Sequence, residues 1–341
     1  MAYPFARNRC SKADGTLIMS QATARAHSNI ALIKYWGKRA GPRNLPAVGS
    51  ISVTLDALYT DTTVVFDDTL SADCAQLDDK PADTARLTPF LDLVRTRAGI
   101  DTRASIVSAN NFPTGAGLAS SASGFAALSL AATRAAGLEL DARELSILSR
   151  QGSGSAARSI FGGFAEMHRG TRDDGSDAFA EPMLEPEDWP VEIVVAITDT
   201  ATKSVNSSIG MSHLDERSDY YQAWIDHSES DLAAMRDAIA ARDFETVGAL
   251  TEMSCLKLHG LMMSTRPGLI YWNPATVAAM QAVRSLREAG TPVYFTIDAG
   301  PQVKALCAPG YGEAVARSLE GVPGVLETRR TALGPAARVI A

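Results

Sequence analysis

Cysteine is scarce in this sequence of 341 residues, and long apolar runs are missing from it. Only four cysteines occur, and they are far apart, without a Cys-x-x-Cys pair: Cys10, Cys74, Cys255 and Cys307. A disulfide framework or a zinc knuckle is therefore not expected, and this usage is typical of proteins in a reducing cytoplasm. No apolar stretch reaches the roughly 18 residues that a membrane helix needs, so no membrane partner is expected.

Basic residues are outnumbered by acidic ones. The chain has 32 Lys and Arg against 39 Asp and Glu, which gives a net charge of −7. Because contacts to phosphate backbones need a basic surface, this balance disfavours a nucleic-acid partner. The five histidines show no spacing typical of metal ligands, so no protein ligand to a metal is assigned.

The length predicts about two domains at roughly 100–200 residues per domain. Residues 1–20 contain cations without a following apolar core, which is a poor signal peptide. We expect them to form a disordered N-terminal extension. We place the domain boundary near residue 190, which gives an N-terminal domain over 21–190 and a C-terminal domain over 191–341.

The periodicity predicts helices and strands that alternate without a strict βαβ repeat, which indicates an α+β protein. Strands are expected within Ile51–Phe66, at Ser105–Val107, up to Met167, and over Val191–Thr198 and Val293–Ile297. Helices are expected over Thr88–Ala98 and Ser120–Ala136, after Asp141, in several pieces over Asp215–Ser264, and over Pro274–Ala289. Asp173–Asp188 is predicted to be a loop, and the tail from Tyr311 to hold one helix and one strand.

The segment Asn110–Gly124 is rich in glycine and serine and links a predicted strand to a predicted helix. Gly115 and Gly117 allow tight turns, and Ser120, Ser121 and Ser123 add hydroxyls at the helix start. A helix N-terminus also offers N–H groups and a positive dipole end, so the segment can cradle an anion. The alternative is a glycine-rich turn with a serine cap. The segment lacks the Gly-Lys-Ser/Thr of a Walker A loop and the third glycine of the dinucleotide fingerprint.

Three further segments carry groups that can bind an anionic substrate. Asn29–Arg39 places three cations beside two aromatic residues, and Arg150–Ser159 combines small residues with the planar fork of Arg158. Asp298 ends a predicted strand before Ala-Gly-Pro, where a carboxylate can point into a cleft. The plainer alternatives are a solvated strand end with extended lysines, a surface arginine on a helix, and an ordinary Asp turn.

These segments together resemble one family. Pro113-Thr-Gly-Ala-Gly117-Leu-Ala-Ser-Ser121 is similar to the phosphate loop of the GHMP kinase superfamily, and its continuation to Gly124 narrows the likeness to the mevalonate diphosphate decarboxylases. Lys34-Tyr-Trp-Gly-Lys-Arg39, Gly152-Ser-Gly-Ser-Ala156 with Arg158, and Phe295-Thr-Ile-Asp298-Ala-Gly-Pro301 resemble further motifs of that family. The resemblance implies a two-domain fold with a ribosomal-protein-S5-like N-terminal domain, a ferredoxin-like α/β C-terminal domain and an active-site cleft between them.

The same resemblance implies residue roles. Asp298 would be the catalytic acid, Arg158 would hold the substrate carboxylate, and Asn29 would help to orient the reacting end of the substrate. Lys34 would be a further catalytic residue that lies in the same pocket as the diphosphate. The diphosphate would be held by four residues: Tyr35, Lys38, Ser153 and Ser155, with Ser207 as a further contact. ATP would be bound by the loop residues Gly115, Gly117, Leu118, Ala119, Ser120, Ser121, Ala122 and Ser123. Some relatives have one more arginine between the early strands, for which residues 71–79 offer no counterpart.

The implied reaction converts mevalonate 5-diphosphate and ATP, with Mg²⁺, into isopentenyl diphosphate, ADP, phosphate and carbon dioxide. A homodimer and a cytoplasmic location are expected from the family. Three alternatives stay open. They are a sister enzyme that decarboxylates mevalonate 5-phosphate or only phosphorylates mevalonate at its 3-hydroxyl, another small-molecule kinase of the superfamily, and a non-catalytic nucleotide-binding protein.

Overall fold

The computed structural model describes residues 21–41, 43–113, 117–201, 205, 207–211 and 214–341. The predicted extension 1–20 and the loop residue Gly115 lie outside the described residues. The described chain forms two sheets with helices packed on them, so the α+β prediction is confirmed. None of the described helices is long and apolar enough to span a membrane.

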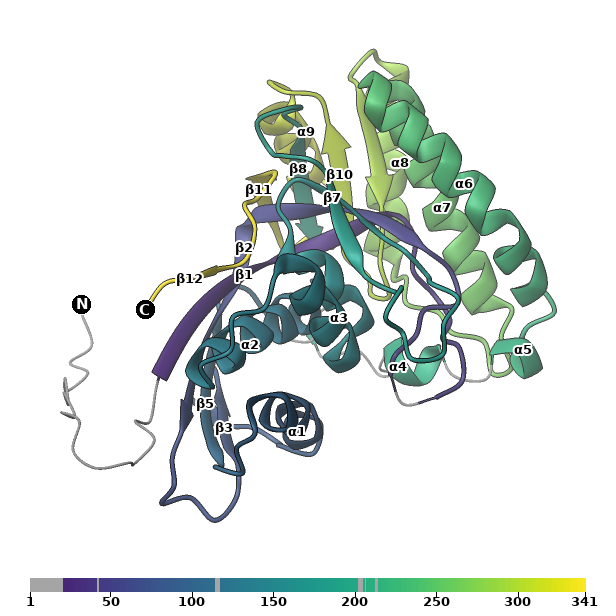
Figure 1. Cartoon of the computed structure of the whole chain (residues 1–341). Helices are drawn as coiled ribbons and strands as arrows, with labels where there is room; N and C mark the ends of the chain where they lie inside the picture. Colours follow the sequence, from purple (N-terminus) through teal and green to yellow (C-terminus); the bar gives the residue numbers. More distant parts are fainter. Residues whose placement is uncertain (1–20, 42, 114–116, 202–204, 206, 212–213) are drawn as a thin grey trace.

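The larger sheet is built around two long strands, β1 (Gln21–Ile33) and β2 (Ser50–Phe66), which run through the middle of the molecule (Figure 1). Its strand order is β12-β1-β2-β5-β3-β4, and β6 and β7 extend it from β2. The remaining strands are β3 (Cys74–Leu77), β4 (Lys80–Pro81), β5 (Ala104–Asn110), β6 (Phe164–Met167), β7 (Ala180–Leu184) and β12 (Arg338–Val339). All pairs are antiparallel except β3 with β5.

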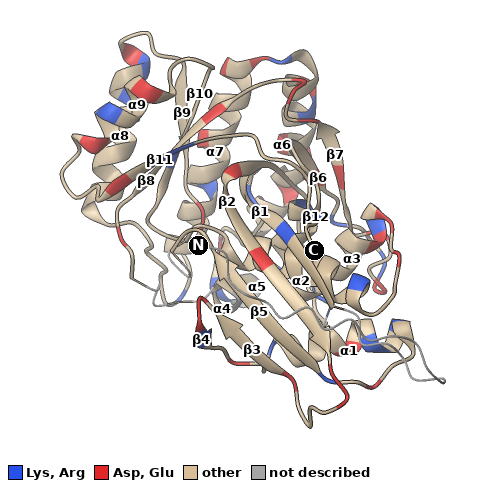
Figure 2. Cartoon of the chain, turned by 90° about the vertical axis from the view of Figure 1, so that its left-hand side faces the viewer, with Lys and Arg blue, Asp and Glu red and all other residues tan. Residues whose placement is uncertain are grey.

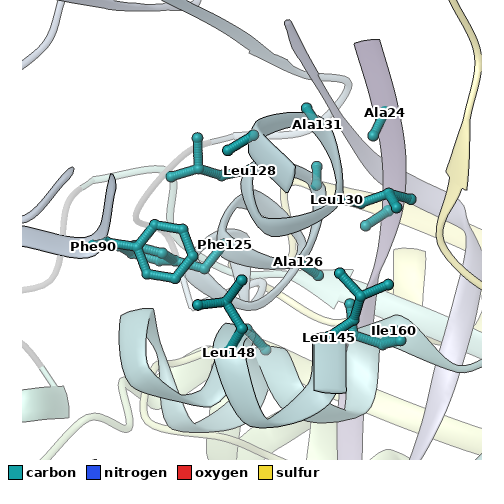
Figure 3. Close-up of a cluster of buried hydrophobic side chains, with 14 of the residues drawn as sticks. Ala24, Phe90, Phe125, Ala126, Leu128, Leu130, Ala131, Leu145, Leu148 and Ile160 are labelled. Carbon is teal, nitrogen blue, oxygen red and sulfur yellow. The ribbon is translucent and has the colours of Figure 1, made fainter. Parts of the chain in front are cut away.

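Helices α1 (Leu87–Ala98), α2 (Ser120–Ala135) and α3 (Ala142–Gly152) and the 3-10 helix η1 (Gly154–Ile160) pack beside this sheet. Small alanines let α2 lie close against β1 and β2, and its larger side chains meet α1 and α3 (Figure 3). Phe125 of α2 contacts Phe90 of α1 edge to face, with ring centroids 5.4 Å apart. Helix α3 begins with the capping box of Asp141 and Glu144, as its sequence predicts.

The smaller sheet has the order β11-β8-β10-β9 and is antiparallel throughout. Its strands are β8 (Glu192–Ile197), β9 (Val293–Thr296), β10 (Val303–Cys307) and β11 (Glu327–Ala332). The helices of this half are α4 (Ser207–Gly210), α5 (Leu214–Arg217), α6 (Tyr221–Ala241), α7 (Phe244–Met263), α8 (Pro274–Glu288) and α9 (Gly312–Glu320). A buried cluster that joins residues of β1, β2, β8 and α6 fixes the two halves against each other.

Two expectations from the sequence are wrong. The segment 173–188 is not all loop, because β7 pairs with β6 inside it as a short strand. Its sequence Ala-Glu-Pro-Met-Leu lacks alternation and contains Pro182, which hides the strand signal. The tail holds two strands instead of one, and β12 returns to pair with β1 in the larger sheet. The boundary near residue 190 stays a prediction.

Candidate active site

A cavity of about 270 Å³ lies where the end of β1, the start of α2, the helix η1 and the turn after β9 meet. Its described lining includes thirteen of the residues singled out from the sequence: Asn29, Lys34, Tyr35, Lys38, Gly117, Ala119, Ser120, Ser121, Ser153, Ser155, Arg158, Ser207 and Asp298. Four motifs that are far apart in sequence therefore come together at one place. Acidic and basic residues are interspersed over the visible ribbon in Figure 2.

Asp298 follows β9 and is held between two ammonium groups. Lys34 Nζ lies 2.6 Å from Asp298 Oδ1, and Lys304 Nζ lies 3.4 Å from Oδ2. Both lysine side chains are only 1% exposed, whereas Asp298 keeps 24% of its side chain accessible from the cavity. Burial raises the pKa of the Asp298 carboxyl, but the two lysines outweigh it, so the pKa lies well below its usual range. Asp298 is therefore an anion at neutral pH.

Arg158 is a buried cation that meets neutral partners. Its Nη1 donates to Ser50 Oγ, and its Nη2 donates to Asn29 Oδ1 at 3.1 Å. Within the described part of the chain no carboxylate lies within 4 Å of it, and its Nε has no hydrogen-bond partner. Burial lowers the pKa of Arg158 to about 10, against the attraction of Asp298. The guanidinium stays charged, and its geometry suits a carboxylate from a ligand.

Asn29 is fixed at a break in the β1–β2 register, which shifts between His27 and Asn29. Its Nδ2 donates to Ser155 O at 3.0 Å and to Ser159 Oγ at 2.7 Å, which leaves Oδ1 to accept from Arg158. Such irregularities re-aim side chains beside active sites. Asn29 therefore orients Arg158 from the neighbouring strand.

A second pair of cations lies along the cavity wall. Lys38 Nζ donates to Asn44 Oδ1 at 2.8 Å, and burial with the nearby charge of Arg86 lowers the pKa of Lys38. Arg86, at the start of α1, donates to Gly152 O at 3.0 Å and lies 5.2 Å from the ring centroid of Phe125. Residues 71–79 offer no such arginine, and Arg86 lies seven residues later, directly before α1. Four cations thus line the described cavity against one carboxylate.

Hydroxyl groups complete this wall. Ser153 Oγ lies 3.4 Å from the hydroxyls of both Ser121 and Ser155, which joins the start of α2 to η1. Burial raises the pKa of Tyr35 to about 12, so its phenol keeps its proton, and its buried hydroxyl finds no hydrogen-bond partner among the described residues. It can donate to an anion beside the serines.

The loop before α2 has the backbone of an anion cradle. Ala119 precedes the helix with φ +59°, and Gly117 has φ +82°. A Cβ on Gly117 would come within 3.0 Å of Gly300 Cα, so only glycine fits here. Three predicted ATP residues do not line the cavity, because they are buried in the core: Leu118, Ala122 and Ser123. The Ser123 hydroxyl instead lies 2.7 Å from Thr60 Oγ1, so its side chain supports the helix start from behind.

Residues 26–180 match the family model of the diphosphomevalonate decarboxylase-like N-terminal domain, and residues 193–322 match that of the mevalonate 5-diphosphate decarboxylase C-terminal domain. The chain belongs to the mevalonate diphosphate decarboxylase family. Both matched ranges contribute to the cavity, the first with Lys34 and Arg158 and the second with Asp298.

Individual family members match most of the chain. The diphosphomevalonate decarboxylase of Candida albicans is 37% identical over 83% of this chain and 83% of its own. The phosphomevalonate decarboxylase of Haloferax volcanii is 35% identical, with coverage of 83% and 87%. Among solved structures, the Staphylococcus aureus mevalonate diphosphate decarboxylase has a TM-score of 0.89 at 38% identity, covering 95% of this chain and 99% of that one. A structure described as "MDDEF in complex with MVAPP, AMPPCP and Magnesium" has a TM-score of 0.87 at 42% identity, with coverage of 94% and 99%.

Proposed function

We propose that this protein catalyses the ATP-dependent decarboxylation of mevalonate 5-diphosphate to isopentenyl diphosphate, with release of ADP, phosphate and carbon dioxide, in the mevalonate pathway. One observation carries the proposal. Arg158 is a buried cation without a protein carboxylate beside it in the described chain, and it shares a cavity with an ionised Asp298. A substrate that brings both a carboxylate and a hydroxyl satisfies both groups.

The remaining cations support a polyanionic substrate. Lys38 and Arg86, with the hydroxyls of Tyr35, Ser153 and Ser155, would hold the diphosphate. Charge-assisted hydrogen bonds from such groups are about twice as strong as neutral ones. Binding energy from this non-reacting part of the substrate can then be used to orient the reacting part.

Asp298 would accept a hydrogen bond from the 3-hydroxyl and aim its oxygen at the γ-phosphorus of ATP. As the new O–P bond forms, the bond from the γ-phosphorus to the bridging oxygen of ADP breaks, and ADP leaves with its electrons. The O–H bond breaks at the same time, and the proton passes to the carboxylate. Because Lys34 and Lys304 keep the pKa of Asp298 low, it is a weak base, which fits a loose transition state in which positioning matters most. Lys34 Nζ, 2.6 Å from Asp298 Oδ1, would also attract the negative charge of the transferred group.

The new 3-phosphate then leaves with the electrons of its C–O bond. The electrons of the bond to the carboxylate carbon form the double bond, and carbon dioxide departs. Arg158, held by Ser50 and Asn29, would fix the carboxylate so that the two breaking bonds are aligned.

The ATP phosphates would lie on the backbone around Gly117 and at the start of α2, where Ser120 and Ser121 line the cavity. Hydroxyl oxygens are donors that Mg²⁺ accepts, and the described residues hold no cluster of three acidic, His or Cys side chains. Ser120 and Ser121 would help to hold the ion beside the nucleotide. Its contribution when bound is to offset negative charge on the phosphates. The structure in complex with AMPPCP and magnesium, at 42% identity, supports both ligands.

The test is an ATP-dependent assay with mevalonate carrying no, one or two 5-phosphates, in which ADP and carbon dioxide are measured separately. Equal amounts of the two products with the diphosphate alone are expected. Preference for the monophosphate would favour the activity named for the Haloferax volcanii relative, and ADP without carbon dioxide would indicate a 3-kinase. ATP binding without turnover of any mevalonate would contradict the proposal. A homodimer and a cytoplasmic location remain expectations from the family.

A further inference from the structure

Lys304 is a buried lysine whose contacts go beyond its effect on the pKa of Asp298, and the sequence motifs give it no role. It lies on β10, opposite Thr296 of β9, and is 1% exposed. Its Nζ donates to Gly117 O at 3.0 Å and lies 3.4 Å from Asp298 Oδ2. It is not among the residues that line the cavity, so it acts on the site from behind. A buried ammonium is costly, and burial lowers the pKa of Lys304 despite the attraction of Asp298.

The two groups that Lys304 contacts come from different halves of the molecule. Gly117 belongs to the loop before α2, and Asp298 belongs to the turn after β9. The same two segments also touch at Gly117 and Gly300, where a Cβ on Gly117 would come within 3.0 Å of Gly300 Cα. Lys304 is thus the charged part of a contact between the phosphate loop and the turn that carries the reacting carboxylate.

The hydrogen bond to Gly117 also sets the direction of the loop backbone. In a trans peptide the C=O and the following N–H point to opposite sides. With Gly117 O turned to Lys304, the N–H of Leu118 is turned away from it. The bond thereby fixes one peptide group of the segment that would face the ATP phosphates.

We propose that Lys304 is a positioning residue that holds the Asp298 carboxylate and the Gly117 carbonyl at a fixed separation, so that the hydroxyl acceptor and the phosphate loop are aligned for phosphoryl transfer. This inference rests on the proposed function for its kinetic consequence. Its structural consequence, the state of Asp298, can be measured without turnover.

The charges around Asp298 define that measurement. The carboxylate faces Lys34 at the end of β1, Lys304 on β10 and Arg158 on η1, with Cys255 and His259 on α7 nearby. Burial raises the pKa of Cys255 to about 11 and, with Lys34, lowers the pKa of His259 to about 3, so both are neutral at pH 7. Loss of Lys304 therefore removes one of three cations and raises the pKa of Asp298.

The experiment compares the full-length protein with Lys304→Met, which keeps the side-chain volume, and with Lys80→Met, which removes an exposed lysine on β4. We expect K304M to lower kcat about 100-fold, the scale of a small misplacement of reacting groups, with the KM for mevalonate 5-diphosphate changed little. In ¹³C NMR of the Asp carboxyl groups, with Asp298→Asn for assignment, the Asp298 titration should move to higher pH in K304M. K80M should match the wild type in both.

Lys304→Arg and Lys304→Gln separate charge from hydrogen bonding. K304R should keep the low pKa of Asp298, whereas K304Q keeps a donor for Gly117 O and should raise that pKa as K304M does. If K304M does not fold, K304Q replaces it in the same assays. A kcat and an Asp298 titration equal to those of K80M would overturn the inference while the proposed function stands. If the wild type were inactive on every mevalonate, the proposed function would be wrong. The NMR titration would still decide whether Lys304 lowers the pKa of the Asp298 carboxyl group.

Discussion

Buried charge around the described cavity is balanced in two different ways. Lys34 and Lys304 are paired with Asp298 inside the protein. Arg158 is instead hydrogen-bonded, among the described residues, to the neutral groups of Ser50 and Asn29. The paired group is arranged before any ligand arrives, because its charges already hold one another. Around Arg158 positive charge is in excess, and a ligand anion must balance it.

The difference indicates two functions for buried charge, which are to orient a reacting group and to attract an anionic ligand. Charges paired within the protein fix the direction of a reacting group at little cost when the substrate enters. A cation held only by neutral partners costs folding free energy but attracts an anion strongly when one binds. Substitutions of either kind of cation should therefore slow turnover, but only loss of a paired charge should lower the stability of the ligand-free protein.

Asp298→Asn should produce the largest loss of activity. The amide cannot accept the hydroxyl proton and no longer pairs with the lysines, so kcat should fall by about 10³-fold or more. Binding of mevalonate 5-diphosphate, measured by calorimetry, should change little because Lys38 and Arg86 remain. Near-normal release of ADP by this variant would remove the role assigned to Asp298.

Arg158→Met and Lys34→Met form a matched pair that tests the comparison directly. Arg158→Met should slow release of carbon dioxide about 100-fold, yet leave the ligand-free protein equally stable or more stable by about 1 kcal/mol, since an unbalanced buried cation is removed. Lys34→Met should slow turnover too but lower stability by about 3 kcal/mol, because it breaks a buried pair. Urea unfolding measures both. Equal destabilisation by the two substitutions would mean that the charge of Arg158 is balanced within the protein.

The burial of His259 beside the paired group of Lys34, Lys304 and Asp298 should make the stability of the protein depend on pH. Burial and the Lys34 charge lower the pKa of His259 to about 3, from 6.5 in the unfolded chain. The unfolded state therefore binds more protons between these values, and stability falls as the pH drops from 6.5 towards 3. One such group contributes a slope of at most about 1.4 kcal/mol per pH unit. In unfolding measured from pH 7 to 4.5, His259→Gln should have a flatter profile than the wild type. An unchanged slope would show that His259 is not the group responsible.

Much of this site can be predicted from local sequence, because each of its motifs is a short run whose residues stay together in space. Lys34-Tyr35 and Asp298 line the cavity as the sequence motifs predict. Ser123 is different, since the run that contains it turns helical and directs its hydroxyl inward to Thr60. Only some side chains of the first helical turn face a ligand, and the sequence motif alone does not indicate which of them do.

Arg86 and Lys304 could not be assigned a role in the same way. Each is held by a partner distant in sequence, Gly152 O for Arg86 and Gly117 O for Lys304. The spacing along the chain contains no information about such pairs until the sheets are assembled. The strand β7 was missed for a related reason, as its pairing with β6 defines it more than its own residues do.

Asn44→Ala should have the smallest effect of the four. Asn44 has φ +50° and orients Lys38, accepting from Lys38 Nζ at 2.8 Å while its Nδ2 donates to Gln151 O at 2.6 Å. Loss of one such hydrogen bond to a cation costs about 1.5 kcal/mol at the lower end of its range, so the KM for mevalonate 5-diphosphate should rise about tenfold, with kcat nearly unchanged. Because Lys38 lies among groups assigned to the diphosphate, the increase should be smaller with a monophosphate substrate. An equal increase for both substrates would assign Lys38 to a part of the ligand that the two share, and a loss confined to kcat would place Asn44 with the reacting end instead.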